Sequence, residues 1–191
     1  MKTLLKIFFL MAVISLVAGC NKDVLFDEQS TDPQLKKAHV EETVPFKADF
    51  TVWDQSDYTD VTCGGYPVFR LTMIGEGVAT HLGKLSTSFT FCCNVKTGEY
   101  YNTDVVFTAA NGDELYASIP IGQILPNEGD NSDYYQTYFN DKMEFTGGTG
   151  RFKGASGEAM SNAFVHDDPV PENWHTDFFC TGTLTLVEGK K

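Results

Sequence analysis

The chain has 191 residues, 42% of them hydrophobic, and a formal net charge of −12. Nucleic-acid-binding proteins carry clusters of lysine and arginine that meet the phosphates, and here 14 basic residues stand against 26 acidic ones without such a cluster, which excludes that class. The same acidity disfavours direct attraction to anionic lipid headgroups.

The N-terminus is typical of a bacterial export signal. Lys2 and Lys6 give the first residues a positive charge. The apolar run that follows, residues 7–17, is too short for a bilayer core, which needs ~20 helical residues. The stretch from Val17 to Cys20 resembles the lipobox of bacterial lipoproteins, where the cysteine thiol receives a diacylglyceryl group. An ordinary secretory signal with an incidental cysteine is the alternative.

The lipobox resemblance implies a membrane anchor at Cys20. The mature chain would carry two or three acyl chains such as palmitate, and two chains anchor a protein stably where one is marginal. Without Lys2 and Lys6 the formal charge is −14, that is −12 minus 2. Because Asn21 stands where an aspartate favours inner-membrane retention in Gram-negative lipoproteins, we expect the outer membrane, with the domain on its periplasmic or outer side.

Composition divides the chain into four segments. Residues 1–19 are the signal peptide, and residues 20–43 are polar with few large apolar side chains, as in a flexible tether. Residues 44–188 form one domain, long enough to bury a hydrophobic core. Residues 189–191 are a C-terminal tail.

Apolar residues in the domain alternate with a period of two, which indicates β-strands. Two of the alternating runs flank Asn111-Gly112, a pair that tolerates positive φ, and this predicts a β-hairpin. After the signal segment, apolar residues at helical spacing never continue for three turns. We therefore expect an all-β domain of seven or eight short strands. The alternating segments are residues 46–53, 88–95, 104–119, 138–145 and 176–187.

A glycine-rich block occupies residues 144–159. Its TGGTG start superficially resembles some dinucleotide-binding domains, but the spacing fits neither that fingerprint nor a phosphate-binding loop, and prolines and a strand pattern follow instead of a helix. We therefore expect no nucleotide or other cofactor and interpret the glycines as turn and bulge positions. They are Gly147, Gly148, Gly150, Gly154 and Gly157.

Two glycine motifs carry a family resemblance. The motif GEGVATHLGK contains Gly75, Gly77 and Gly83, and GGTGRFKGASG follows at residues 147–157. The pair resembles exported bacterial proteins with the allene oxide cyclase-like barrel, and the second motif is also similar to a stretch of plant dirigent proteins. This implies a single antiparallel eight-stranded β-barrel, calycin-like, that binds a small apolar or amphipathic ligand in its cavity. A cyclase or isomerase and a structural envelope domain are the alternatives.

Candidate site residues are few, and no catalytic residue is assigned. His81 could bind a ligand, although a lone histidine without a visible partner fits a structural turn better. Residues 166–175 contain histidines and carboxylates but not at a recognised metal-ligand spacing. The acidic segment 127–135 does not match the EF-hand register, so we expect no metal. Tyrosines near predicted turns mark the expected rim of a binding cavity: Tyr100, Tyr101, Tyr134 and Tyr135.

Four cysteines besides Cys20 lie in the domain, Cys63, Cys92, Cys93 and Cys180, and an even number in an exported protein favours disulfides. Cys92 and Cys93 point to opposite faces of a strand, which disfavours a bridge between them. We expect each of these two to pair with Cys63 or Cys180. A zinc site is the alternative, although CxxC spacing is missing.

Overall fold

The computed structural model describes residues 40–129 and 131–188. The signal segment 1–19, the expected lipidation site Cys20, most of the expected tether and residues 189–191 lie outside this part. The first strand begins at Glu41, inside the segment interpreted as a tether. In the described part of the chain, no helix is long and apolar enough to cross a bilayer.

The described residues are almost entirely β-structure, with two single-turn 3-10 helices, η1 (Gly150–Phe152) and η2 (Pro171–Asn173). The strands are β1 (Glu41–Asp54), β2 (Val68–Ala79), β3 (Gly83–Asn94), β4 (Glu99–Ala109), β5 (Glu114–Gln123), β6 (Leu125–Pro126), β7 (Thr137–Phe139), β8 (Lys142–Gly148), β9 (Ser156–Met160), β10 (Ala163–His166) and β11 (His175–Val187).

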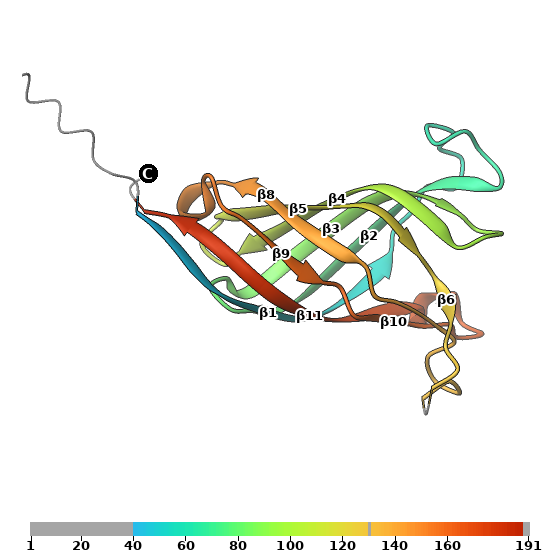
Figure 1. Cartoon of the computed structure of the whole chain (residues 1–191). Helices are drawn as coiled ribbons and strands as arrows, with labels where there is room; N and C mark the ends of the chain where they lie inside the picture. Colours follow the sequence, from blue (N-terminus) through green and yellow to red (C-terminus); the bar gives the residue numbers. More distant parts are fainter. Residues whose placement is uncertain (1–39, 130, 189–191) are drawn as a thin grey trace, which may run out of the picture. The chain divides into compact units, whose positions relative to one another are not determined.

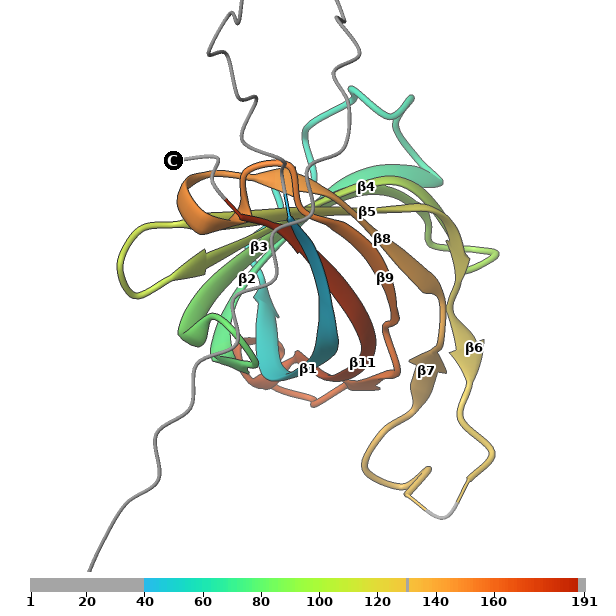
Figure 2. The same ribbon diagram turned by 60° about the vertical axis from the view of Figure 1, so that its left-hand side comes forward.

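The strands form one antiparallel sheet that closes on itself (Figures 1 and 2). The order is β1-β2-β3-β4-β5-β8-β9-β11, and β11 pairs with β1 along almost its whole length, from Glu41 opposite Val187 to Trp53 opposite His175. The expected antiparallel eight-stranded barrel is therefore confirmed. The predicted hairpin is present as well, with Gly112 at a φ of 85° between β4 and β5.

Three strands of the barrel are each followed or preceded by a short strand after a brief interruption. The partners are β5 and β6, β8 and β7, and β9 and β10. At two of the breaks, the Ser161 amide donates to the Asp141 carbonyl at 2.9 Å and the Phe179 amide to the Asn162 carbonyl at 2.8 Å. The short strands β6, β7 and β10 thus extend one end of the barrel, and these two hydrogen bonds bridge the breaks beside β9 and β11.

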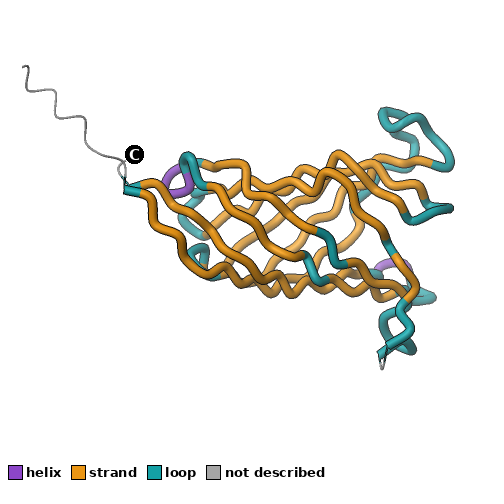
Figure 3. Tube along the Cα trace, in the orientation of Figure 1, coloured by secondary structure: helices purple, strands orange, loops and turns teal. Residues whose placement is uncertain are grey.

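The two ends of the barrel differ (Figure 3). Short turns after β2, β4 and β8 lie at one end, which we call the closed end. The other, the loop end, carries the longer segments 55–67, 127–136 and 167–174. Figure 3 shows the loops of these segments in teal at the right-hand end, with η2 in purple.

Aromatic rings fill the closed end. The ring of Phe46 lies 4.7 Å from that of Phe145 and 6.4 Å from that of Phe107, centroid to centroid. Phe152 is fully buried and comes from η1, inside the glycine-rich block that links β8 to β9. That block is therefore the turn that delivers a phenylalanine into this end of the core.

The motif glycines occupy positions that reject a side chain. An added Cβ would lie 2.0 Å from the carbonyl oxygen of Thr51 at Gly75, and 2.3 Å from that of Asp49 at Gly77. Both contacts are with β1, so the backbones of β1 and β2 approach closely at this bend. At Gly148 the corresponding distance to the Glu114 carbonyl is 2.1 Å. The other motif glycines have positive φ: Gly83, Gly147, Gly150, Gly154 and Gly157.

The described residues form one disulfide, between Cys63 and Cys92, whose Cα atoms are 5.6 Å apart. It ties the segment 55–67 to β3. Cys93 and Cys180 are buried and free, which differs from the expectation that Cys93 would also pair. These two lie on β3 and β11, separated by β1 and β2, or roughly 14 Å along the wall at ~4.8 Å per strand. A disulfide needs Cα atoms within about 7 Å.

Candidate ligand-binding cavity

The loop end of the barrel contains a cavity of about 180 Å³. Its inner wall is apolar because alternate residues of each strand point into a barrel. The inner residues are Val52 from β1, Leu71 and Met73 from β2, Phe89 and Phe91 from β3, Ile119 from β5 and Phe178 from β11.

Stacked rings close the cavity toward the closed end. Phe178 stacks on Phe50 at a centroid distance of 4.7 Å and on Phe89 at 5.1 Å. Phe50 in turn meets Phe107 edge to face at 5.5 Å. These contacts join the floor of the cavity to the filled closed end, so the empty space is confined to the loop end.

Tyr100 forms a fixed part of the cavity wall. Its hydroxyl donates to Oδ2 of Asp141 at 2.7 Å, and its ring lies 5.6 Å from the rings of both Phe91 and Phe139. Burial, and then the hydrogen bond to Asp141, raises the pKa of Tyr100 above its ordinary value. The tyrosine therefore stays neutral and presents mainly its ring to the cavity.

Thr103 places an unpaired hydroxyl beside the same cavity. A bulge in β4, with Asn102 at a φ of 54°, turns both Tyr100 and Thr103 inward although they are three positions apart. Thr103 is 2% exposed, and its Oγ1 has no hydrogen-bond partner among the described residues. A buried hydroxyl without a partner costs about 1–3 kcal/mol, so such groups in native proteins call for an explanation.

Polar and aromatic side chains surround the opening, and we call this set the rim: Asp54, Tyr58, Asp167, Trp174 and His175. Oδ1 of Asp54 accepts from the Ser56 amide at 2.8 Å, and Oδ2 accepts from the Tyr58 hydroxyl. Burial, and then this hydrogen bond, raises the pKa of Tyr58. The segment that carries Tyr58 is the one held to β3 by the disulfide.

A second depression, the outer groove, adjoins the rim. It is lined by Trp53, Asp54, Gln55, Tyr58, Glu172 and Trp174. Asp54, Tyr58 and Trp174 belong to both sets, so the groove and the cavity meet at these side chains. The indole N–H of Trp174 donates to the carbonyl of Asp168, which fixes that ring at the junction.

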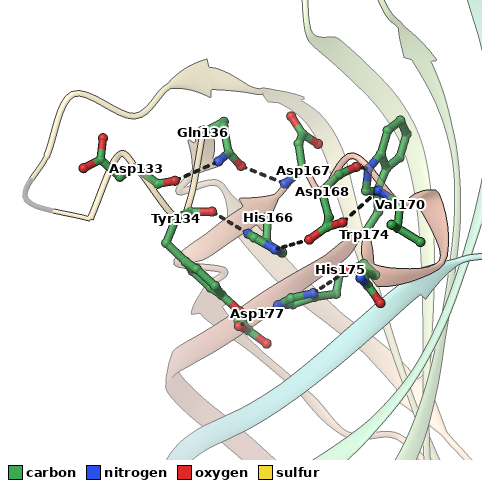
Figure 4. Close-up of polar contacts among 11 residues, drawn as sticks. Asp133, Tyr134, Gln136, His166, Asp167, Asp168, Val170, Trp174, His175 and Asp177 are labelled. Atoms are coloured by element: carbon green, nitrogen blue, oxygen red, sulfur yellow. Dashed lines mark hydrogen bonds and ion pairs between the residues drawn. The ribbon is translucent and has the colours of Figure 1, made fainter.

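Two histidines form a polar cluster beside the rim (Figure 4). His166 and His175 are cross-strand partners in β10 and β11, with ring centroids 4.9 Å apart. Nδ1 of His166 is 2.6 Å from the Tyr134 carbonyl, and Nδ1 of His175 is 2.7 Å from the Asn173 carbonyl. Since a carbonyl only accepts, each Nδ1 is assigned as the protonated donor.

The other ring nitrogens of this cluster face carboxylates. Nε2 of His166 is 3.7 Å from Asp168, and Nε2 of His175 is 3.6 Å from Asp177. Within residues 40–129 and 131–188, no group of three or more histidine, cysteine, aspartate or glutamate side chains is placed to hold a metal ion. The contacts of His175 with the Asn173 carbonyl and with Asp177 hold this rim residue in place.

The structure disperses the residues expected at a binding rim. Tyr100 lines the cavity, whereas Tyr101, its neighbour in β4, is not among the lining residues. Tyr134 stacks on His166 at 4.0 Å, and the Tyr135 hydroxyl donates to Asp177 at 2.7 Å. Burial, and then that hydrogen bond, raises the pKa of Tyr135 to about 12.

His81 lies away from the cavity, in the turn between β2 and β3. Its φ is 64°, in the left-handed region that histidine enters more readily than most residues. Its Nε2 is 3.2 Å from the carbonyl oxygen of Pro45. The contact joins the turn to β1, which is a structural role at the closed end.

Three residues at the opening were not assigned from the sequence: Asp54, Thr103 and Trp174. They come from a strand end, a bulge and a loop, so periodicity carries no sign of them. The two tryptophans of the chain, Trp53 and Trp174, are the nearest available signal, because each sits next to an acidic or histidine residue at a strand end.

No protein-family model and no curated protein matches the sequence. Among solved structures, the chain is similar to the pterocarpan synthase dirigent protein GePTS1, with a TM-score of 0.50 and 13% identity over 84% of this chain and 99% of that one. At this identity the likeness concerns the fold alone. The chain thus has a dirigent-like barrel fold.

Proposed function

We propose that this protein is a lipid-anchored barrel of the bacterial cell envelope that binds a small, largely apolar ligand inside the loop end. The observation that carries the binding role is the cavity of about 180 Å³, with its apolar inner wall and polar rim. Binding sites for small molecules combine these features, with few polar groups that orient the ligand.

The cavity volume limits the ligand to a small size. An engineered apolar cavity of about 150 Å³ binds benzene, whereas pockets for drug-sized ligands measure about 300–1,000 Å³. The volume here therefore suits one ring with short substituents. The stacked floor of Phe89 and Phe178 offers such a ring aromatic contacts.

The envelope location rests on the sequence alone. The order of Lys2, Lys6, the apolar run and Cys20 supports lipidation, and Asn21 supports the outer membrane of a Gram-negative cell. The domain would be held on the periplasmic side or the cell surface. A ligand-binding barrel there would meet compounds that enter or leave the cell.

Binding is favoured here over the isomerase or cyclase alternative. Tyr100 is the candidate proton donor within the cavity wall, but its hydroxyl proton already lies in a hydrogen bond to Asp141. His175 at the rim has its Nδ1 engaged with the Asn173 carbonyl and its Nε2 toward Asp177. Proton transfer needs a group within hydrogen-bond reach of the reacting atom, and these are turned to other partners.

The test fills the cavity from one strand. Ile119 is 1% exposed and lines the cavity, whereas Ile121, two residues along β5, is 63% exposed. Ile119→Phe should reduce toluene binding at least about tenfold, measured by ligand-observed NMR, while Ile121→Phe leaves it unchanged. Leu71→Phe provides a second filling variant if the first unfolds. Unchanged toluene affinity in both folded filling variants would contradict the proposal.

A further inference from the structure

We infer that the ligand of this barrel is a hydrophobic cation, with its apolar body in the cavity and a positively charged amine at the opening. This inference rests on the proposed binding function and specifies its ligand class. It starts from the charges that surround the opening.

The opening is acidic, and no lysine or arginine belongs to its lining. Asp54 and Asp167 belong to the rim, and Glu172 belongs to the outer groove. Among the described residues, none of these three carboxylates forms an ion pair, and no lysine or arginine lines either space. A cationic ligand would supply the missing positive charge.

The two basic residues on the neighbouring segments are turned to other partners. Arg70 lies 3.9 Å from Asp60 in the segment 55–67, and Lys96 lies 5.0 Å above the ring of Tyr66. Neither belongs to the lining of the cavity or the groove. No lysine or arginine of the neighbouring segments therefore pairs with the carboxylates at the opening.

Aromatic faces accompany these carboxylates. Trp53, Tyr58 and Trp174 line the outer groove, and each is more than a third exposed. Aromatic rings attract cations through the negative charge of their faces, most strongly in tryptophan, and cages of aromatic and acidic groups are a common way to bind alkylammonium groups. Large exposed rings beside unpaired carboxylates fit an amine better than a neutral or anionic group.

Thr103 gives independent evidence of an occupant. It lines the cavity, is 2% exposed and keeps an unpartnered hydroxyl among apolar neighbours. A ligand whose ring carries a hydrogen-bonding substituent would satisfy this group and remove its desolvation cost. The ligand class is thus an arylalkylamine, with a polar atom on the ring as an added preference.

The test compares three ligands with one ring and different charges. Dissociation constants of the full-length protein for phenethylamine, 2-phenylethanol and 3-phenylpropionate are measured by NMR at pH 8 and low salt. We expect the amine to bind about tenfold more tightly than the alcohol and the carboxylate to bind most weakly, with the preference for the amine shrinking as salt is added.

Matched variants assign the effect to the opening. Glu172→Gln and Asp54→Asn should each weaken phenethylamine about threefold to tenfold and leave 2-phenylethanol unchanged, whereas Glu76→Gln, on the exposed face of β2, changes neither. Thr103→Val should abolish a preference for tyramine over phenethylamine. Glu172 lies in an exposed loop, so its variant remains informative if Asp54→Asn unfolds.

Three results would overturn the inference, and the last is distinguishable from the first two. Equal affinity for amine and alcohol, or no loss in the two carboxylate variants, refutes the cationic ligand while the apolar binding role stands. No binding of any of the three compounds, together with no binding of toluene, refutes the proposed function as well.

Discussion

Phe50 and Phe178 face each other across the seam that closes the barrel, with ring centroids 4.7 Å apart and an interplanar angle of 12°. They are register partners in β1 and β11, the first and last strands of the barrel. The same stack forms the boundary between the filled closed end and the cavity. One aromatic contact therefore both spans the closing seam of the barrel and limits the depth of the candidate site.

Truncating this stack should destabilise the protein strongly. Phe178→Ala removes a buried ring and leaves a void, which costs about 3–5 kcal/mol in free energy of unfolding. The adjacent Phe179, 42% exposed, points to the other face, and Phe179→Ala should cost less than about 1 kcal/mol. Urea unfolding followed by circular dichroism measures both. Similar losses in the two variants would argue against the stack as the structural seam.

The cysteines predict a specific thiol count. Unfolded in denaturant without reductant, the domain should expose two reactive thiols, Cys93 and Cys180, and four after reduction. Mass spectrometry after alkylation counts them directly. Cys63→Ser with Cys92→Ser should lower stability by about 3–4 kcal/mol, because the bridge closes a loop with a separation of 29 residues. Four reactive thiols before reduction would show that the bridge does not form.

The buried thiols predict a loss of stability in alkali. Burial raises the pKa of Cys93 from 9.0 to about 11 and that of Cys180 to about 12. Above pH 9 the unfolded chain releases these protons while the folded one keeps them, so the stability they contribute is present below pH 9 and is lost toward pH 12.

Cys180→Ala isolates one of these groups. Removing it should make the fall of the unfolding free energy between pH 9 and 12 less steep, by up to about 1.4 kcal/mol per pH unit. Urea unfolding at several pH values measures the slope. Identical slopes for the variant and the parent would show that Cys180 does not titrate differently in the two states.

The fold could be anticipated wherever strands keep a regular apolar alternation. β1, β3, β4, β5 and β11 have it, and the Asn111-Gly112 pair marks a hairpin. β2 was harder because glycines replace side chains at Gly75 and Gly77, where it approaches β1. β9 and β10 are short, and β9 consists mainly of small residues.

The site could be anticipated only in part because its groups come from distant segments. Tyr100 was identified as a rim candidate, and it lines the cavity. Thr103 points inward only because the bulge at Asn102 shifts the alternation, and a bulge depends on the partner strand. The rim joins a strand end, a disulfide-tethered segment and the residues before β11, and sequence spacing does not reveal that these meet.

The expected lipidation leads to a direct test of location. Cys20→Ser should move the protein from the membrane fraction to the soluble fraction, because the acyl chains would be lost. Cys180→Ser, which alters a buried thiol of the domain, should leave the partition unchanged if the variant folds. Immunoblots of separated fractions give the result. A Cys20→Ser protein that stays with the membrane would refute the lipoprotein interpretation.

Gly150 tests the role of the glycine-rich block. Its φ is 52°, and an added Cβ would lie 1.8 Å from Oδ1 of Asp113, so Gly150→Val combines backbone strain with a collision. At Gly112 the φ is 85° and nothing lies within 4 Å, so Gly112→Val has the strain alone. We expect a cost of about 1–3 kcal/mol at Gly112 and a larger one at Gly150, where the Asp113 carboxylate must turn away and give up its hydrogen bonds with Asn111 and the Arg151 amide. Thermal unfolding compares the two variants, and equal melting temperatures would mean that the close contact with Asp113 does not hold this turn in place.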